Sequence, residues 1–233
     1  MNKLFYITIV LLFFQFSCTE KREKTKKTII NKVNKTTTNS LSIKKHKNTT
    51  KKSTFPLTDK TAKQFLLDYG KKNQETKGKI STKFGDIYFK LYQNTPLHRA
   101  NFVMLVKEGY FNKTVFQRVV FEFIIQGGSD DTWDIAKLRK HYGKYRISPE
   151  FKNKHRFGAM AMARQWELNP NKLSDPFEFY IVVDPRGTHH LDKEHTVFGQ
   201  VTKGFKVLRK IERVKVDARD WPIDDIDLKI EVY

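Results

Sequence analysis

The stretch FQRVVFEFIIQGG, residues 116–128, decides the fold that we predict for this chain. Its two apolar runs, VVF and FII, consist of β-branched and aromatic residues, which favour strands. Arg118 stands beside the first run and Gln126 closes the second. Arginine is seldom buried without a partner, so two interpretations of Arg118 are open. It is either an edge-strand residue whose head reaches water, or an arginine that a rigid sheet presents to an apolar pocket.

The segments around this stretch predict more strands and few helices. A hairpin is predicted over residues 80–91, where KFGD forms the turn. Further strands are predicted at 157–163, 177–183, 195–201 and 228–232, and helices at 95–109 and 205–214. Residues 129–157 are polar, and we expect an irregular segment anchored by Trp133 and Tyr145. Many short strands with two well-formed helices predict a mainly β fold, a closed antiparallel barrel without exposed edges.

The amino end has the pattern of an export signal. Lys3 precedes an unbroken apolar run over residues 4–14, which is too short to span a bilayer comfortably. The single cysteine, Cys18, follows this run and excludes an intrachain disulfide and a Cys-rich metal site. Residues 1–18 resemble a bacterial lipoprotein signal, in which the cysteine becomes the lipidated first residue. A cleaved signal peptide without a lipid and an uncleaved signal anchor are the alternatives.

The charge of the chain is uneven. The net charge is +20, and residues 19–79 contain 18 Lys/Arg against 5 Asp/Glu. Residues 19–57 are rich in Lys, Thr and Asn without an apolar period, so we predict a basic, disordered tether. Nucleic acid is out of reach behind an export signal, so anionic lipid headgroups are the expected neighbours. Residues 58–77 are expected to form a short helix over 59–69, which Gly70 ends, and a linker.

Residues 78–233 resemble a cyclophilin-type peptidyl-prolyl cis-trans isomerase. The resemblance rests on four motifs in the family's order, and residues 95–111 are similar to its first helix. The motifs are FQRVVFEFIIQGG, GAMAMAR (158–164), FEFYIVV (177–183) and HHLDKEHTVFGQV (189–201). The resemblance implies an eight-stranded antiparallel barrel capped by two helices. It also implies an enzyme that isomerises X–Pro bonds without a cofactor.

The resemblance assigns roles to individual residues. Arg118 matches the catalytic arginine. Ten further positions match the substrate groove: Phe123, Ile124, Gln126, Ala163, Arg164, Glu178, Tyr180, His190, Leu191 and His195. Glu178 replaces the usual Gln, so we expect a negative charge that pairs with Arg118 or favours basic peptides. His190 stands where many members of the family have Trp. We expect this difference to affect binding of the family's cyclic-peptide inhibitor more than activity. Residues 129–146 lack the family's Gly-rich loop.

The residue types suit the chemistry of proline isomerisation. Amide resonance gives the X–Pro bond a rotation barrier of about 18–20 kcal/mol. In the twisted state the proline nitrogen gains a lone pair, and a guanidinium that donates to it stabilises that state more than the planar one. Arg118 is always charged and presents several donors. The apolar residues would clamp the ring, and Gln126 would donate to the substrate backbone.

The sequence therefore predicts an isomerase acting on exported proteins. We expect a monomer, lipid-anchored in the bacterial cell envelope and facing the periplasm or cell surface, with proline-containing polypeptides as partners. The alternative is a catalytically weak module of the same fold that binds proline-containing peptides as a chaperone or assembly factor. A metal site is a third hypothesis, built from His189, His190 and His195 with Asp184 or Asp192. Adjacent histidines on an extended segment point to opposite sides, so we expect no metal.

Overall fold

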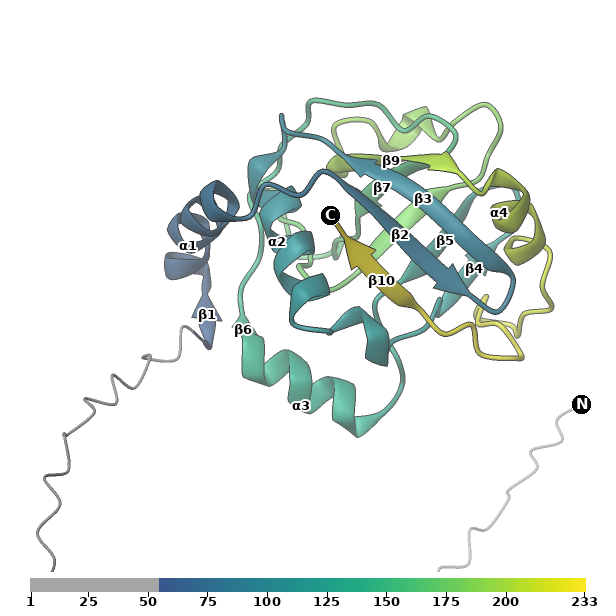
Figure 1. Ribbon diagram of the computed structural model, residues 1–233, viewed down its shortest axis with the longest axis horizontal. Coiled ribbons are helices and arrows are strands. Elements are labelled where there is room, and N and C mark those ends of the chain that lie inside the picture. Colours follow the sequence, from purple (N-terminus) through teal and green to yellow (C-terminus); the bar gives the residue numbers. More distant parts are fainter. Residues whose placement is uncertain (1–54) are drawn as a thin grey trace, which may run out of the picture. The chain divides into compact units, whose positions relative to one another are not determined.

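The computed structural model describes residues 55–233, in which an eight-stranded antiparallel sheet forms the centre (Figure 1). The strand order is β10-β2-β3-β9-β7-β8-β5-β4. The strands are β2 (Lys77–Thr82), β3 (Gly85–Leu91), β4 (Arg118–Val120), β5 (Ile124–Gly127), β7 (Ala159–Met162), β8 (Phe179–Val182), β9 (Val197–Lys203) and β10 (Lys229–Val232). The predicted signal, with Cys18, and nearly all of the predicted tether lie outside the described residues.

Four α-helices surround the sheet in the described part of the chain. They are α1 (Asp59–Lys72), α2 (Pro96–Lys107), α3 (Trp133–Tyr142) and α4 (Phe205–Ile211). Figure 1 shows α1 packed on the outside of α2, with α4 beside β3. Two short 3-10 helices, η1 (Phe111–Lys113) and η2 (His189–Leu191), lie in the loops. A parallel pair of two-residue strands, β1 (Leu57–Thr58) and β6 (Gly143–Lys144), joins the N-terminal segment to the residues after α3.

The mainly β, eight-stranded antiparallel fold is confirmed, but the expected full closure is overstated. β4 and β10 are the two ends of the sheet and do not pair as strands. They are linked through an isolated bridge between Val115 and Asp227 and a hydrogen bond from Phe116 N to Ile226 O of 2.9 Å. The outer edge of β4 is instead covered by a loop, because Val119 N donates to the carbonyl of Asp220 at 2.8 Å. A covered edge cannot pair with another chain.

Alternation along the strands separates a main core from a second apolar face. Val119, Ile125 and Ile181 point into the main core. In this core Phe102 of α2 packs edge-on against Phe179, with 5.4 Å between the ring centroids. Residues one position away point to the opposite face. This two-residue period explains why one short segment supplies both the core and the site.

Two local predictions were wrong in instructive ways. The segment 129–157 is not irregular throughout, because α3 occupies part of it. Trp133 is not an anchor, since it is 84% exposed at the start of α3, whereas Tyr145 is buried and its hydroxyl donates to Asn101 Oδ1 at 2.7 Å.

Gly70 does not end α1. A Cβ at this position would lie 3.1 Å from the Cβ of Ala100, so Gly70 allows α1 and α2 to approach closely.

None of the helices in residues 55–233 has both the length and the apolar character needed to cross a membrane.

Candidate active site

One row of residues crosses four neighbouring strands and contains the predicted catalytic arginine. Arg118 of β4 stands opposite Gln126 of β5, Gln126 opposite Tyr180 of β8, and Tyr180 opposite Ala161 of β7. Directly opposed residues of antiparallel strands project from the same face. The register therefore brings Arg118, Gln126 and Tyr180 together on the face away from the main core.

An apolar cluster lies on the same face, and we call it the outer cluster. Its buried members are Ile124, Ala159, Ala161, Ala163, Tyr180, Val182, Leu191 and Val197, with Tyr92 and Phe123 partly buried against them. His190 lies with its ring parallel to Phe123, at 5.8 Å between ring centroids and 13° between planes. The fold thus brings together Phe123, His190 and Leu191, which come from two distant sequence motifs.

Arg118 is held in place through its Nε atom. Its Nε lies 3.2 Å from Oδ2 of Asp220, and its side chain is 41% exposed. Neither terminal guanidinium nitrogen has a hydrogen-bond partner among residues 55–233. Sequence reasoning missed Asp220, which lies 102 residues away in a turn that Asp217 caps by accepting from Arg219 N and Trp221 N. The structure therefore places Arg118 on the end strand with its side chain partly exposed, on the same face of the sheet as the outer cluster.

Glu178 does not form the expected ion pair with Arg118. Its Oε1 accepts from Arg139 Nη2 at 2.9 Å. Its Oε2 accepts from Gln126 Nε2 at 2.8 Å and from Gln117 Nε2 at 3.2 Å. The cause is the position of α3, which carries Arg139 to the carboxylate. No alternation or motif in residues 129–146 indicated that Arg139 would reach the groove.

A buried polar network supports the floor of the outer cluster. The hydroxyl of Tyr180 lies 2.9 Å from Nε2 of His155, whose Nδ1 lies 2.9 Å from Oδ1 of Asp192. Burial lowers the pKa of His155, although Asp192 opposes this shift. We therefore assign a neutral ring that donates to Asp192 and accepts from Tyr180. Sequence reasoning retained the ring of Tyr180 but gave its hydroxyl no partner.

His195 packs against Tyr180 of the outer cluster and is not placed for proton transfer. Its ring packs edge-on against the ring of Tyr180, with 5.5 Å between the ring centroids. Its Nδ1 lies 3.1 Å from the carbonyl oxygen of Met162. Burial lowers the pKa of His195 to about 4, so the ring is neutral at pH 7 and its Nδ1–H donates to that carbonyl. A neutral, buried imidazole contributes shape and apolar surface beside this cluster.

Arg164 braces the rim with its side chain. The side chain is 3% exposed, donates from Nε to Glu194 O at 2.8 Å and forms an ion pair with Glu194 Oε2 at 2.7 Å. Its guanidinium also covers the ring of Trp166 at 4.0 Å. The side chain of Arg164 is therefore fixed by Glu194 and Trp166.

The histidines of the metal hypothesis do not converge. His189 Nδ1 lies 3.0 Å from Asp192 Oδ2, His190 stacks on Phe123, and His195 contacts Met162 O. Within residues 55–233, no group of three or more His, Cys, Asp or Glu side chains is placed to hold a metal ion.

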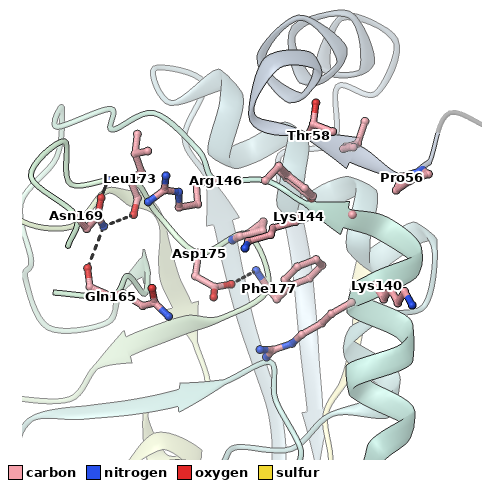
Figure 2. A pocket seen from close by; sticks show the side chains of 15 residues that line it. Pro56, Thr58, Lys140, Lys144, Arg146, Gln165, Asn169, Leu173, Asp175 and Phe177 are labelled. Carbon is pink, nitrogen blue, oxygen red and sulfur yellow. Dashed lines mark hydrogen bonds between the residues drawn. The ribbon is translucent and has the colours of Figure 1, made fainter. Parts of the chain in front are cut away.

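Arg139 is also one of the residues that line a cavity of about 640 Å³, which Figure 2 shows. Pro56 and Thr58 line one side of it, and Lys140 and Lys144 lie on the neighbouring segment. Asp175 points into this region and accepts from Phe177 N at 2.7 Å. Burial, reinforced by the nearby charge of Glu178, raises the pKa of Asp175 to about 6. Arg139 therefore lines this cavity and also contacts Glu178, which accepts from Gln126 in the row of Arg118.

The fold and the site define a class: an antiparallel β-sheet protein that carries a guanidinium on the same face as an apolar cluster. A family model described as cyclophilin type peptidyl-prolyl cis-trans isomerase/CLD matches residues 77–232. The chain belongs to this cyclophilin family.

Named relatives support the same assignment. Peptidyl-prolyl cis-trans isomerase-like 1 of Homo sapiens is 32% identical over 158 residues, covering 66% of this chain and 89% of that protein. Peptidyl-prolyl cis-trans isomerase-like 2 of Rhizopus delemar is 34% identical over 166 residues, covering 69% of this chain. The match spans 29% of the length of that longer relative.

A solved structure has the same fold. The crystal structure of a Cryptosporidium parvum cyclophilin type peptidyl-prolyl cis-trans isomerase has a TM-score of 0.57 and 28% identity, covering 68% of this chain and 98% of that one. A second structure of that protein, in the presence of the dipeptide Ala-Pro, has a TM-score of 0.56.

Proposed function

We propose that this protein is a peptidyl-prolyl cis-trans isomerase and that Arg118 is its catalytic residue. The observation that carries the proposal is the position of the Arg118 guanidinium. Its terminal nitrogens have no partner among residues 55–233, and it shares one face of the sheet with Gln126 and the outer cluster. A cation with free donors beside an apolar surface is the arrangement that a twisted X–Pro amide needs.

The reaction requires electrostatic stabilisation rather than a nucleophile. The barrier arises from amide resonance, which is lost when the bond twists and the proline nitrogen becomes pyramidal. A terminal nitrogen of Arg118 donates to that lone pair, so the interaction exists in the twisted state and is absent in the planar one. No covalent bond breaks, which agrees with the neutral His195 in the pocket wall.

The apolar residues hold the proline ring while the preceding carbonyl rotates. Phe123, Ile124 and Leu191 offer the ring contacts, and the small side chain of Ala163 leaves room beside them. Burial of the ring against these residues removes water near Arg118, and a lower local dielectric strengthens its field. Gln126 lies opposite Arg118 and offers its amide to the substrate backbone.

The decisive experiment is cis-to-trans relaxation of a short X–Pro peptide with the full-length protein in detergent micelles. We expect acceleration by the protein and its near loss in Arg118→Ala. The same acceleration in both proteins would contradict the role of Arg118.

One observation favours a second candidate, a module that binds proline-containing peptides without efficient turnover. The carboxylate of Asp220 contacts Nε of Arg118 and therefore offsets part of the charge available for catalysis. A peptide that binds saturably without faster relaxation would support this candidate. The protein would then act as a chaperone or assembly factor.

We also propose that the protein is an exported bacterial lipoprotein. The support is the pattern of residues 1–18 and the basic segment that follows, with Cys18 as the lipidated residue. It would act on exported proteins as an envelope-anchored monomer. Cys18→Ser should release the protein from the membrane fraction, while Ser40→Ala should leave it bound. Retention of the Cys18→Ser protein would favour an uncleaved signal anchor.

A further inference from the structure

α3 brings a cation to the substrate face that none of the predicted roles uses. The Nε of Arg139 donates to the hydroxyl oxygen of Tyr110 at 3.0 Å. Its Nη2 donates to the carbonyl of Gly128 at 3.1 Å and to Glu178 Oε1 at 2.9 Å. The side chains of Arg139 and Glu178 are 26% and 20% exposed. These contacts fix the guanidinium in one orientation, in a partly desolvated place where an ion pair is effective.

The carboxylate of Glu178 in turn determines how Gln126 is oriented. An ionised carboxylate accepts hydrogen bonds and donates none. The side-chain amide of Gln126 must therefore direct its nitrogen, not its oxygen, toward Glu178, at 2.8 Å. The same Oε2 also accepts from Gln117, so two amide groups are arranged around one charge. Gln126 stands opposite Arg118 in the row that the substrate must cover.

We propose that Arg139 is a positioning residue for this site: it holds and neutralises Glu178, which fixes the amide of Gln126 beside Arg118. The proposal rests on the proposed function and deepens it. Without Arg139, Glu178 would be a partly buried carboxylate with no cation, close to a groove whose own cation is Arg118. Gln126 would lose its fixed orientation, and Glu178 would be drawn toward Arg118. Both changes weaken substrate binding.

The first test is Arg139→Met, with kcat and KM measured separately for an Ala-Pro peptide on the full chain. We expect kcat/KM to fall about tenfold, mainly through KM, because the reacting arginine stays in place. Lys137→Met is the matched control. It removes a cation from the same helix, and Lys137 is 77% exposed and paired with Asp134 on that helix. This control should match the wild type.

Reversal by a second substitution separates positioning from a merely structural role. Glu178→Gln keeps the hydrogen-bonding capacity and removes the charge that Arg139 neutralises. The double variant Arg139→Met/Glu178→Gln should recover kcat/KM to within about twofold of Glu178→Gln alone. If Arg139 served only to attach α3 through Tyr110 and Gly128, the double variant would stay as impaired as Arg139→Met. That result would overturn the proposal, as would unchanged kinetics in Arg139→Met.

Two further measurements keep the outcome decisive. If Arg139→Met does not fold, Arg139→Gln replaces it, because glutamine keeps a hydrogen-bond donor but removes the charge that neutralises Glu178. A loss of affinity in Arg139→Gln that Glu178→Gln reverses then supports the proposal, and no loss overturns it. If the wild-type protein does not accelerate relaxation, the proposed function fails on its own. Peptide affinity by calorimetry then decides the role of Arg139, with the same expected loss and reversal.

Discussion

Asp220 contacts both the side chain and the strand of the arginine at the centre of the site. Its Oδ2 lies 3.2 Å from Arg118 Nε, and its carbonyl accepts from Val119 N at 2.8 Å. One loop residue therefore covers the edge of β4 and limits the rotation of the guanidinium. Asp220 has a φ of 65°, a conformation that Asp and Asn tolerate better than most residues.

Asp220→Asn should lower kcat/KM by about three- to tenfold. The neutral amide still suits the left-handed backbone, but it attracts Arg118 less strongly, so the guanidinium is less well oriented. The free energy of unfolding should change by less than about 0.5 kcal/mol, because the Arg118–Asp220 pair is well exposed. Relaxation kinetics and urea denaturation test this. Faster turnover in Asp220→Asn would instead mean that Asp220 restrains catalysis.

Arg118→Ala should reduce kcat/KM by about a hundredfold, the magnitude seen when one preorganised donor to a transition state is removed. The free energy of unfolding should change by less than about 0.5 kcal/mol, since the side chain is 41% exposed. Arg219→Ala is the matched control, because Arg219 lies in the same region and is 85% exposed. A comparable loss of activity in the control would show that general charge, not Arg118, is responsible.

Tyr180→Phe should reduce stability while leaving most of the activity. The ring stays in the outer cluster, but Nε2 of buried His155 loses its partner at 2.9 Å. An unsatisfied buried polar atom costs about 1–3 kcal/mol. Urea denaturation at pH 7 measures the cost. An unchanged free energy of unfolding would show that His155 finds another partner or water.

Stability should fall as the pH decreases from about 6.5 toward 4 because of His195. Burial lowers its folded-state pKa to about 4, whereas an unfolded histidine titrates near 6.5. In this window the unfolded chain binds more protons, so the stability contributed by the neutral ring is complete above pH 6.5 and is lost on acidification. The loss should be on the order of 1–3 kcal/mol.

The comparison for this prediction is His195→Gln, which does not titrate. Its free energy of unfolding should depend less steeply on pH between 4 and 6.5 than that of the wild type. Parallel curves for the two proteins would contradict the assignment of this pH dependence to His195. Burial also lowers the pKa of His98 and His155, so some acid sensitivity should remain in the variant.

Asp175→Asn should stabilise the protein at pH 7. Burial raises the folded-state pKa of Asp175 to about 6, above its ordinary value of 3.8. The protonated carboxyl of Asp175 contributes its full stability below pH 3.8, and this contribution is lost as the pH rises through 6. At pH 7 the ionised carboxylate therefore lowers the free energy of unfolding. Asparagine still accepts from Phe177 N and carries no charge. A gain of about 1–2 kcal/mol by urea denaturation is expected at pH 7, and no gain at pH 3.5. Equal changes in the free energy of unfolding at pH 7 and pH 3.5 would show that ionisation of Asp175 is not the cause.

Local sequence patterns predicted most of the sheet. β-branched and aromatic runs predicted both strands around Arg118, and turn residues predicted the hairpin of β2 and β3. In the structure, alternation between faces places Ile125 in the main core and Ile124 in the outer cluster. The resemblance of the motifs to the cyclophilin family added five members of the outer cluster: Phe123, Ile124, Ala163, Tyr180 and Leu191.

The tertiary structure alone decided which charges meet. Asp220 reaches Arg118 across 102 residues, and Arg139 reaches Glu178 across 39. The sequence predicted the charge of Glu178 and offered Arg118 as one possible partner, whereas the structure pairs it with Arg139. The sequence also left the residues of α3 as an irregular segment. Alternation is a property of neighbouring residues, so a sequence reveals it directly. An ion pair or an aligned amide depends on how distant segments pack, and the same charges could pair in several ways until the fold fixes their distances.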